Sequence, residues 1–109
     1  MCVGKIKIYK GNCIMNVDLD HVVLIERRLR KICIVTDKEE HEYYERLENI
    51  IPCLDQRFYP CLQGCYINFE KVSMMKDQEI RFKNEYSFYL GKTNFQKTRR
   101  AYKKYLENS

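Results

Sequence analysis

The C-terminal residues 93–106 constrain the fold most, because they have the pattern of a helix with one apolar face and one basic face. At 100° per residue, the apolar side chains fall within one arc of roughly 100° and the cations fill the opposite side. The apolar arc consists of Phe95, Thr98, Tyr102, Tyr105 and Leu106, and the basic side consists of Lys97, Arg99, Arg100, Lys103 and Lys104. We expect the apolar face to dock on a sheet. Thr93 with Gln96 three residues later predicts a capping box at the start of this helix.

Residues 79–90 predict a long strand with one buried side and one exposed side. Apolar residues alternate along it with a period of two, and only Asn84 interrupts them. The apolar series is Ile80, Phe82, Tyr86, Phe88 and Leu90. Gly91 would end this strand. Earlier in the chain, residues 66–74 predict another strand and residues 75–78 predict the turn that joins the two.

The N-terminal third of the chain predicts a hairpin and a buried strand. Residues 5–9 alternate polar with apolar, residues 10–12 carry a turn signal, and residues 13–17 supply the second strand. The β-branched run 32–35 is suited to a short buried strand.

Residues 18–31 are compatible with a helix or with a strand. Asp18 or Asp20 could cap a short helix that continues to Lys31. The run 22–25 is equally suited to a strand, because all four of its residues are aliphatic. The choice sets the order of the strands in the sheet.

Residues 37–51 predict a helix rich in acidic side chains. Asp37 with Glu40 three residues later is a variant of the capping box, and acidic residues in a first turn favour a helix N-terminus. Pro52 would follow the end of this helix. Residues 53–65 predict an irregular connector, and because long connectors are uncommon without a reason, this segment is a candidate functional loop.

Together these elements predict an α+β fold. We expect one antiparallel sheet of four to five strands with two or three helices packed on one face of it. A length of 109 residues is enough for one hydrophobic core and too short for two domains. The expected organisation is therefore a single compact domain that spans residues 1–109.

The chain carries a net charge of +5, and besides Lys5, Lys7 and Lys10 near the N-terminus its cations include two clusters. One cluster lies near residue 29 and the other is the basic face of the C-terminal helix. Together they supply the candidate contacts to nucleic acid or to an acidic partner: Arg27, Arg28, Arg30, Lys31, Lys97, Arg99, Arg100, Lys103 and Lys104. If these residues bind phosphates, both clusters should converge on one surface away from the acidic segment. The alternative is that they are separate solvated faces without a shared purpose.

Six cysteines raise the questions of disulfides and of zinc. The N-terminal residues carry charges where a signal peptide needs an apolar run, so we expect an intracellular protein with reduced thiols. Cys53, Cys61 and Cys65 could hold zinc with His21 or His41, or form a disulfide among themselves in an oxidising compartment. Only Cys61 and Cys65 have the close spacing of a zinc pair, so buried thiols are the favoured interpretation and we expect neither metal nor cofactor.

The sequence offers little for catalysis. His21 and His41 are the only two histidines, and no glycine-rich phosphate loop is present, because the four glycines are scattered. Pairs such as Glu42 and Glu45 are more typical of a solvated face than of an acid and base pair. We therefore expect that the chain is not an enzyme and has no small-molecule substrate.

The main functional hypothesis from the sequence is a non-catalytic binding or assembly module. It would act through protein–protein contacts or by self-association into a homo-oligomer, and the tyrosine-rich and thiol-rich composition is compatible with a viral accessory or structural protein. The alternative hypothesis is a nucleic-acid-binding protein that uses the basic C-terminal amphipathic helix. No apolar stretch approaches the length of a membrane span, so we expect no membrane-spanning segment.

Overall fold

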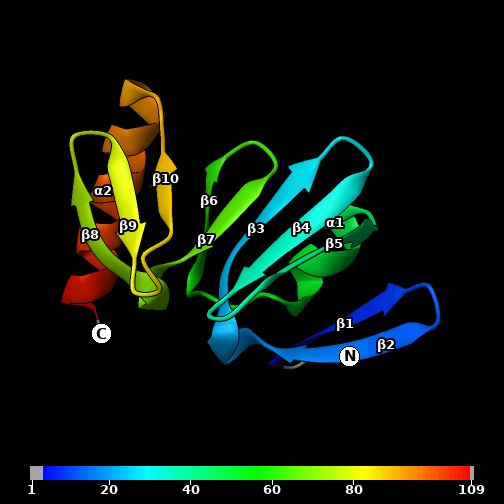
Figure 1. Cartoon of the computed structure of the whole chain (residues 1–109). Helices are drawn as coiled ribbons and strands as arrows, with labels where there is room; N and C mark the ends of the chain where they lie inside the picture. Colours follow the sequence, from blue (N-terminus) through cyan, green and yellow to red (C-terminus); the bar gives the residue numbers. More distant parts are fainter. Residues whose placement is uncertain (1–3, 109) are drawn as a thin grey trace.

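A central sheet of five antiparallel strands forms the middle of the molecule (Figure 1). The computed structural model describes residues 4–108. The strands of this sheet lie in the order β5-β4-β3-β7-β6. Their bounds are Val22–Arg28 for β3, Lys31–Thr36 for β4, Glu40–Tyr44 for β5, Phe58–Leu62 for β6 and Cys65–Asn68 for β7.

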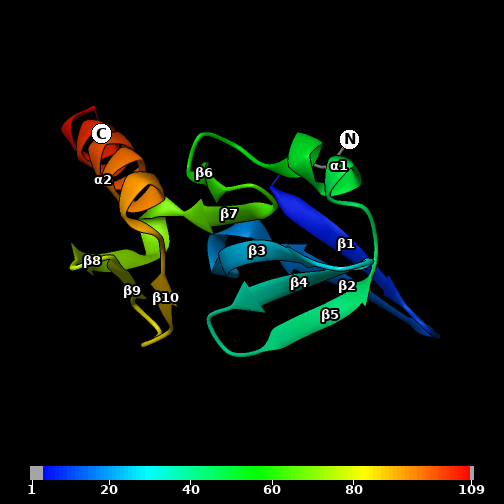
Figure 2. The same cartoon turned by 90° about the horizontal axis from the view of Figure 1, so that it is seen from above.

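Two further layers cover the faces of the central sheet (Figure 2). One face packs against the hairpin of β1 (Lys5–Lys10) and β2 (Cys13–Asp18) and against the short helix α1 (Leu47–Ile50). The other face packs against a three-stranded sheet and the long helix α2 (Lys92–Glu107). The three-stranded sheet has the order β10-β9-β8, with β8 at Val72–Lys76, β9 at Glu79–Phe82 and β10 at Ser87–Tyr89. Each side of the central sheet therefore has its own hydrophobic cluster.

Burial on both faces explains why residues 22–25 form a strand. Leu24 contributes to the cluster beneath α2, and its neighbour Ile25 contributes to the cluster beneath the β1–β2 hairpin. A strand covered on both faces has a continuous aliphatic run rather than an alternating one, and such a run does not differ in period from a buried helix. A 3-10 turn at Leu19–His21 precedes β3, and the strand alternative for residues 18–31 is confirmed.

The prediction of one sheet with helices on a single face is wrong. The predicted strand 66–74 is interrupted by a 3-10 turn at Phe69–Lys71, and the chain leaves the central sheet there. The predicted strand 79–90 divides into β9 and β10, because the Asn84 side chain accepts a hydrogen bond from the Tyr86 backbone N–H and Glu85 has a φ of 72°. These interruptions create the separate three-stranded sheet, and the fold is mostly β.

The predicted acidic helix over residues 37–51 is also wrong. Residues 40–44 form β5, which pairs with β4 and buries Tyr43 opposite Ile32. Glu42, on the same strand, lies within ion-pair distance of cations from the neighbouring β3–β4 turn. Acidic side chains of β5 thus face cations on the neighbouring strands, and the local sequence does not show this pairing. Only α1, of four residues, remains helical, and a 3-10 turn at Ile51–Cys53 follows it.

Several other predictions are confirmed. The N-terminal hairpin, the strand over residues 32–35 and the C-terminal helix are all present. Phe95 and Thr98 are buried in α2, whereas Leu106 is 52% exposed and was wrongly assigned to the buried face. The cap of α2 is Gly91 without a side-chain hydrogen bond, so the predicted capping box is wrong.

The predicted irregular connector over residues 53–65 is wrong in its second half, where β6 and β7 form a hairpin. Cys2, one of the predicted thiols, lies outside the described residues. Within residues 4–108, no helix is both long enough and apolar enough to cross a membrane.

Candidate nucleic-acid interface

The first predicted basic cluster, at residues 27–31, lies in and beside the turn between β3 and β4. Arg28 pairs with Lys31 across the end of the hairpin, so Leu29 and Arg30 are the two turn residues. Arg27 and Arg28 end β3, and Lys31 begins β4. Two-residue turns fit the right-handed twist of paired strands, and this turn places the cations at the end of the central sheet where β3 ends and β4 begins.

The four cations of this turn differ in how far they are neutralised. Glu42 of β5 lies 3.6 Å from Arg28 and 3.8 Å from Lys31, and Arg28 Nε also donates to Glu26 at 3.0 Å. By contrast, Arg27 and Arg30 form no ion pair within residues 4–108. The acidic strand therefore offsets half of this cluster, and Arg27 and Arg30 keep an uncompensated charge.

Arg27 also joins the β3–β4 turn to the β6–β7 turn. Its backbone N–H donates to the carbonyl oxygen of Gly64 at 2.7 Å. Gly64 has a φ of +84°, and a Cβ built on it would lie 3.6 Å from the Arg27 side chain. The left-handed backbone at Gly64 favours glycine and lets the two turns approach each other closely.

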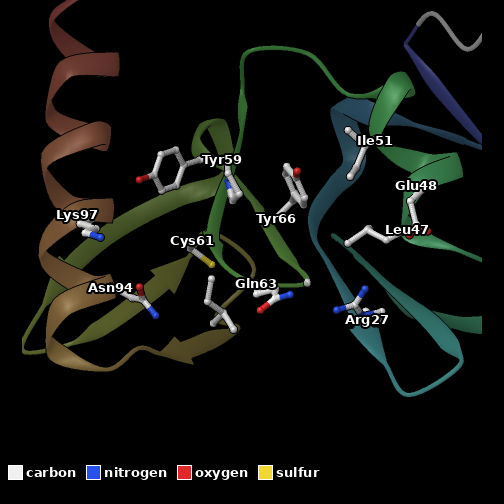
Figure 3. A pocket seen from close by; sticks show the side chains of 13 residues that line it. Arg27, Leu47, Glu48, Ile51, Tyr59, Cys61, Gln63, Tyr66, Asn94 and Lys97 are labelled. Atoms are coloured by element: carbon white, nitrogen blue, oxygen red, sulfur yellow. The ribbon is translucent and has the colours of Figure 1, made fainter.

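A pocket of about 490 Å³ opens where these turns meet the start of α2 (Figure 3). Arg27 comes from β3, Gln63 comes from the β6–β7 turn, and Asn94 and Lys97 come from α2. Cys61 and the rings of Tyr59 and Tyr66 line the space between them. Two cations and two amides from three separate segments thus line one concave site, together with the carboxylate of Glu48 from α1.

We refer to the β3–β4 turn (residues 27–31), the β6–β7 turn (residues 62–64) and the start of α2 (residues 92–97) as the loop edge. Figure 1 shows that these segments lie along the same end of the molecule, while the rest of α2 runs away from it. Lys97 and Arg27 line the same pocket from opposite sides (Figure 3). The structure places the other predicted helix residues, Arg99, Arg100, Lys103 and Lys104, outside the pocket, exposed, and without an ion pair to any described residue.

An aromatic cluster fixes α2 against the rest of the fold. The Phe69 ring lies 5.3 Å from the ring of Tyr102 and 5.3 Å from that of Tyr105, and it stacks on Tyr59. The Tyr105 hydroxyl donates to the Glu70 carboxylate. Burial and this carboxylate raise the pKa of Tyr105 to about 12, so the hydroxyl stays protonated and keeps donating at neutral pH. This cluster holds the second half of α2, and the buried Phe95 packs the first half, which carries Asn94 and Lys97.

Cys53, Cys61 and Cys65 do not lie together in the fold. Cys61 and Cys65 belong to the cluster beneath α2, whereas Cys53 belongs to the cluster on the opposite face of the central sheet, so the three cannot share one zinc ion. In the part of the chain that the structure describes, no group of three or more His, Cys, Asp or Glu side chains has an arrangement that could hold a metal. Burial raises the pKa of Cys33 to about 11, which keeps this thiol protonated.

Sequence reasoning missed two members of the loop edge, Gln63 and Asn94. Neither residue carries a charge, so the pattern of charges along the sequence does not identify them. The available signal was the segment 53–65, predicted to be a functional loop, because Gln63 lies within it. Asn94 is close to the helix start, and the predicted two-face pattern left it unassigned.

Comparison with known proteins identifies a family. A family model described as the LytTr DNA-binding domain matches residues 12–103. Among solved structures, the fold is similar to the LytTr DNA-binding domain of a protein described as a methyl-accepting/DNA response regulator from Bacillus cereus. That similarity has a TM-score of 0.73 at 10% sequence identity, and it covers 90% of this chain and 95% of the other. A search of curated proteins found no match.

Proposed function

Because the chain belongs to the LytTr DNA-binding domain family, we propose that it binds double-stranded DNA and that the loop edge is its contact surface. The observation that carries the choice of surface is that Arg27 and Lys97, from distant parts of the sequence, line opposite sides of one pocket. Neither cation has an ion-pair partner within residues 4–108, so both charges are available to phosphates.

The family match overturns the main functional hypothesis from the sequence. That hypothesis was a protein–protein assembly module, and the nucleic-acid alternative fits the match better. The predictions of a homo-oligomer and of a viral accessory protein receive no support from the comparisons. The basic C-terminal helix remains part of the proposal, but only its first turns belong to the loop edge.

The chemistry of the loop edge suits a duplex. Arginine and lysine position a protein on the phosphate backbone, and amide side chains such as those of Gln63 and Asn94 can pair with base edges, above all with adenine. The major groove of B-DNA is about 12 Å wide and admits a two-stranded β-ribbon. β5 and β7 flank the β3–β4 hairpin almost to its end, so we expect its two-residue turn, rather than a free ribbon, to enter the groove.

The proposed role requires no catalytic chemistry. We infer a non-enzymatic protein that works inside the cell, where its DNA partner is found. Catalysis would need a nucleophile or a base beside a substrate, and the proposed contacts are phosphate and base contacts alone.

Fluorescence anisotropy with a labelled 20-base-pair duplex across a salt series tests the proposal. We expect Arg27→Gln and Lys97→Gln each to weaken binding and to lower the salt slope by about 0.9, the value for one lost phosphate contact. The matched controls are Arg99→Gln and Lys103→Gln on the remote part of α2 and Lys7→Gln on β1, all exposed cations outside the pocket.

The controls separate the candidate surfaces. Unchanged binding in all three control variants supports the loop edge. Equal losses at Arg99 and Lys103 would favour the whole basic face of α2, as in the alternative hypothesis from the sequence. Preference for a single strand of the same length over the duplex, or no binding at low salt, would contradict the proposed function.

A further inference from the structure

Leu29, at the tip of the β3–β4 turn, has an unusual backbone conformation. Its side chain is 95% exposed, and its φ is 58°, in the left-handed region. The first position of a two-residue hairpin turn usually holds Gly, Asn or Asp, because these residues tolerate positive φ. Leucine does not suit this backbone, and its exposed side chain adds nothing to the hydrophobic core, so the stability of the fold does not explain it.

The surroundings of Leu29 combine an apolar surface with positive charge. A shallow pocket of about 540 Å³ is lined by Leu29 and Tyr44 together with Arg28, Arg30, Lys31 and Glu42. Tyr44 is 74% exposed, and Lys31 Nζ lies 4.9 Å from the centre of its ring. One aliphatic side chain among cations is complementary to a surface on which an apolar group lies among negative charges.

The major groove of DNA presents such an apolar group. Among the base edges exposed there, the C5-methyl group of thymine is the apolar feature, and the phosphates flank the groove on both sides. We propose that Leu29 reads thymine by contacting this methyl group, while Arg30 and its neighbours contact the phosphates. This inference rests on the proposed function, since it assigns a sequence-reading residue to the same DNA-binding surface.

The test uses a duplex selected by the wild-type protein from a random library and then remade with each thymine replaced in turn by deoxyuridine. This replacement removes only the methyl group and leaves the protein unchanged. For the wild type we expect a loss of affinity of about three- to tenfold at one or two positions, the size expected for one buried methyl contact. Leu29→Gly keeps the turn, because glycine accepts the positive φ, and it should lose this sensitivity at the same positions.

A second variant separates the side chain from the backbone. Leu29→Met keeps a flexible apolar side chain, so it should retain the sensitivity to deoxyuridine. If the wild type binds the selected duplex but no deoxyuridine position matters, or if Leu29→Gly shows the same sensitivity as the wild type, the thymine contact is overturned and DNA binding stands. If the library yields no bound duplex, the proposed function fails and the inference fails with it.

Discussion

The backbone N–H of Arg27 donates a 2.7 Å hydrogen bond to the carbonyl oxygen of Gly64, which joins two turns that are far apart in the sequence. The bond sets the spacing between the β3–β4 turn and the amide of Gln63. Because the two turns are tied through the main chain, a change in one should displace the other.

Gly64→Ala should therefore affect both stability and binding. At a φ of +84° an added Cβ would lie 3.6 Å from Arg27, an ordinary contact distance, so the cost comes from the backbone and should be about 1–2 kcal/mol in urea unfolding. DNA affinity should fall severalfold as the β6–β7 turn shifts. Gly11→Ala, at a φ of +60° in the β1–β2 turn with nothing within 4 Å, should cost similar stability and leave DNA affinity unchanged.

Glu42→Gln should strengthen DNA binding. The Glu42 carboxylate lies 3.6 Å from Arg28 and 3.8 Å from Lys31, and its removal frees both cations for phosphates. We expect a steeper salt dependence and a severalfold gain in affinity by anisotropy, with a stability change of no more than about 1 kcal/mol, since the pairs are at the surface. Glu107→Gln changes the net charge equally at the far end of α2, and a gain as large there would contradict the local explanation.

Phe69→Ala should loosen α2. The Phe69 ring is 5% exposed and contacts the rings of Tyr59, Tyr102 and Tyr105, so its loss should lower the free energy of unfolding by about 3–5 kcal/mol. Urea unfolding gives this value, and circular dichroism reports whether helical content falls with it. Tyr89→Ala removes an aromatic ring that is 67% exposed and should change stability by less than about 0.5 kcal/mol. A similar loss of unfolding free energy in both variants would contradict the role of the aromatic cluster in holding α2.

Acid should remove a stabilising contribution from Asp55. The Arg57 guanidinium donates to this carboxylate and holds the pKa of Asp55 below its ordinary value of 3.8. A carboxyl group with a lowered folded pKa contributes stability above pH 3.8 and loses it as the pH falls through the folded pKa. The stability difference between wild type and Arg57→Gln should therefore be largest at neutral pH and shrink in acid.

An NMR titration of the Asp55 carboxyl group checks the cause directly. In Arg57→Gln, the pKa of Asp55 should rise toward 3.8. Asp20→Asn removes only the other carboxylate that Arg57 contacts, at 2.7 Å, and should leave the pKa of Asp55 low. An unchanged pKa of Asp55 in Arg57→Gln would refute the assignment.

Local patterns predicted the elements that have one buried side, and they failed where tertiary contacts decide. The α2 helix and the β1–β2 hairpin were predictable because their apolar residues recur with the period of the element. The strand β5 was not, because its acidic residues favour a helix start until Arg28 and Lys31 of the adjacent turn are known. The break at Asn84 depends on a side-chain hydrogen bond to the backbone of Tyr86, which no periodicity reveals.

The candidate site was predictable only in part for the same reason. The sequence identified Arg27 and Lys97 as cations, yet seventy residues separate them and only the fold brings them to one pocket. It gave no means to separate Arg27 and Arg30 from Arg28 and Lys31, because that distinction depends on Glu42 from another strand. Gln63 and Asn94 carry no charge, and only their position in the fold shows that they line the pocket.

Because Leu24 and Ile25 belong to opposite hydrophobic clusters, neither cluster can open without exposing β3. We expect the slowest amide hydrogen exchange in this strand, at the free energy of global unfolding. The tip of the β3–β4 turn is thus attached to the strand that we expect to unfold last. Residues 28–31 could then be exchanged for other sequences, with little penalty to folding, to give the same scaffold new target sites.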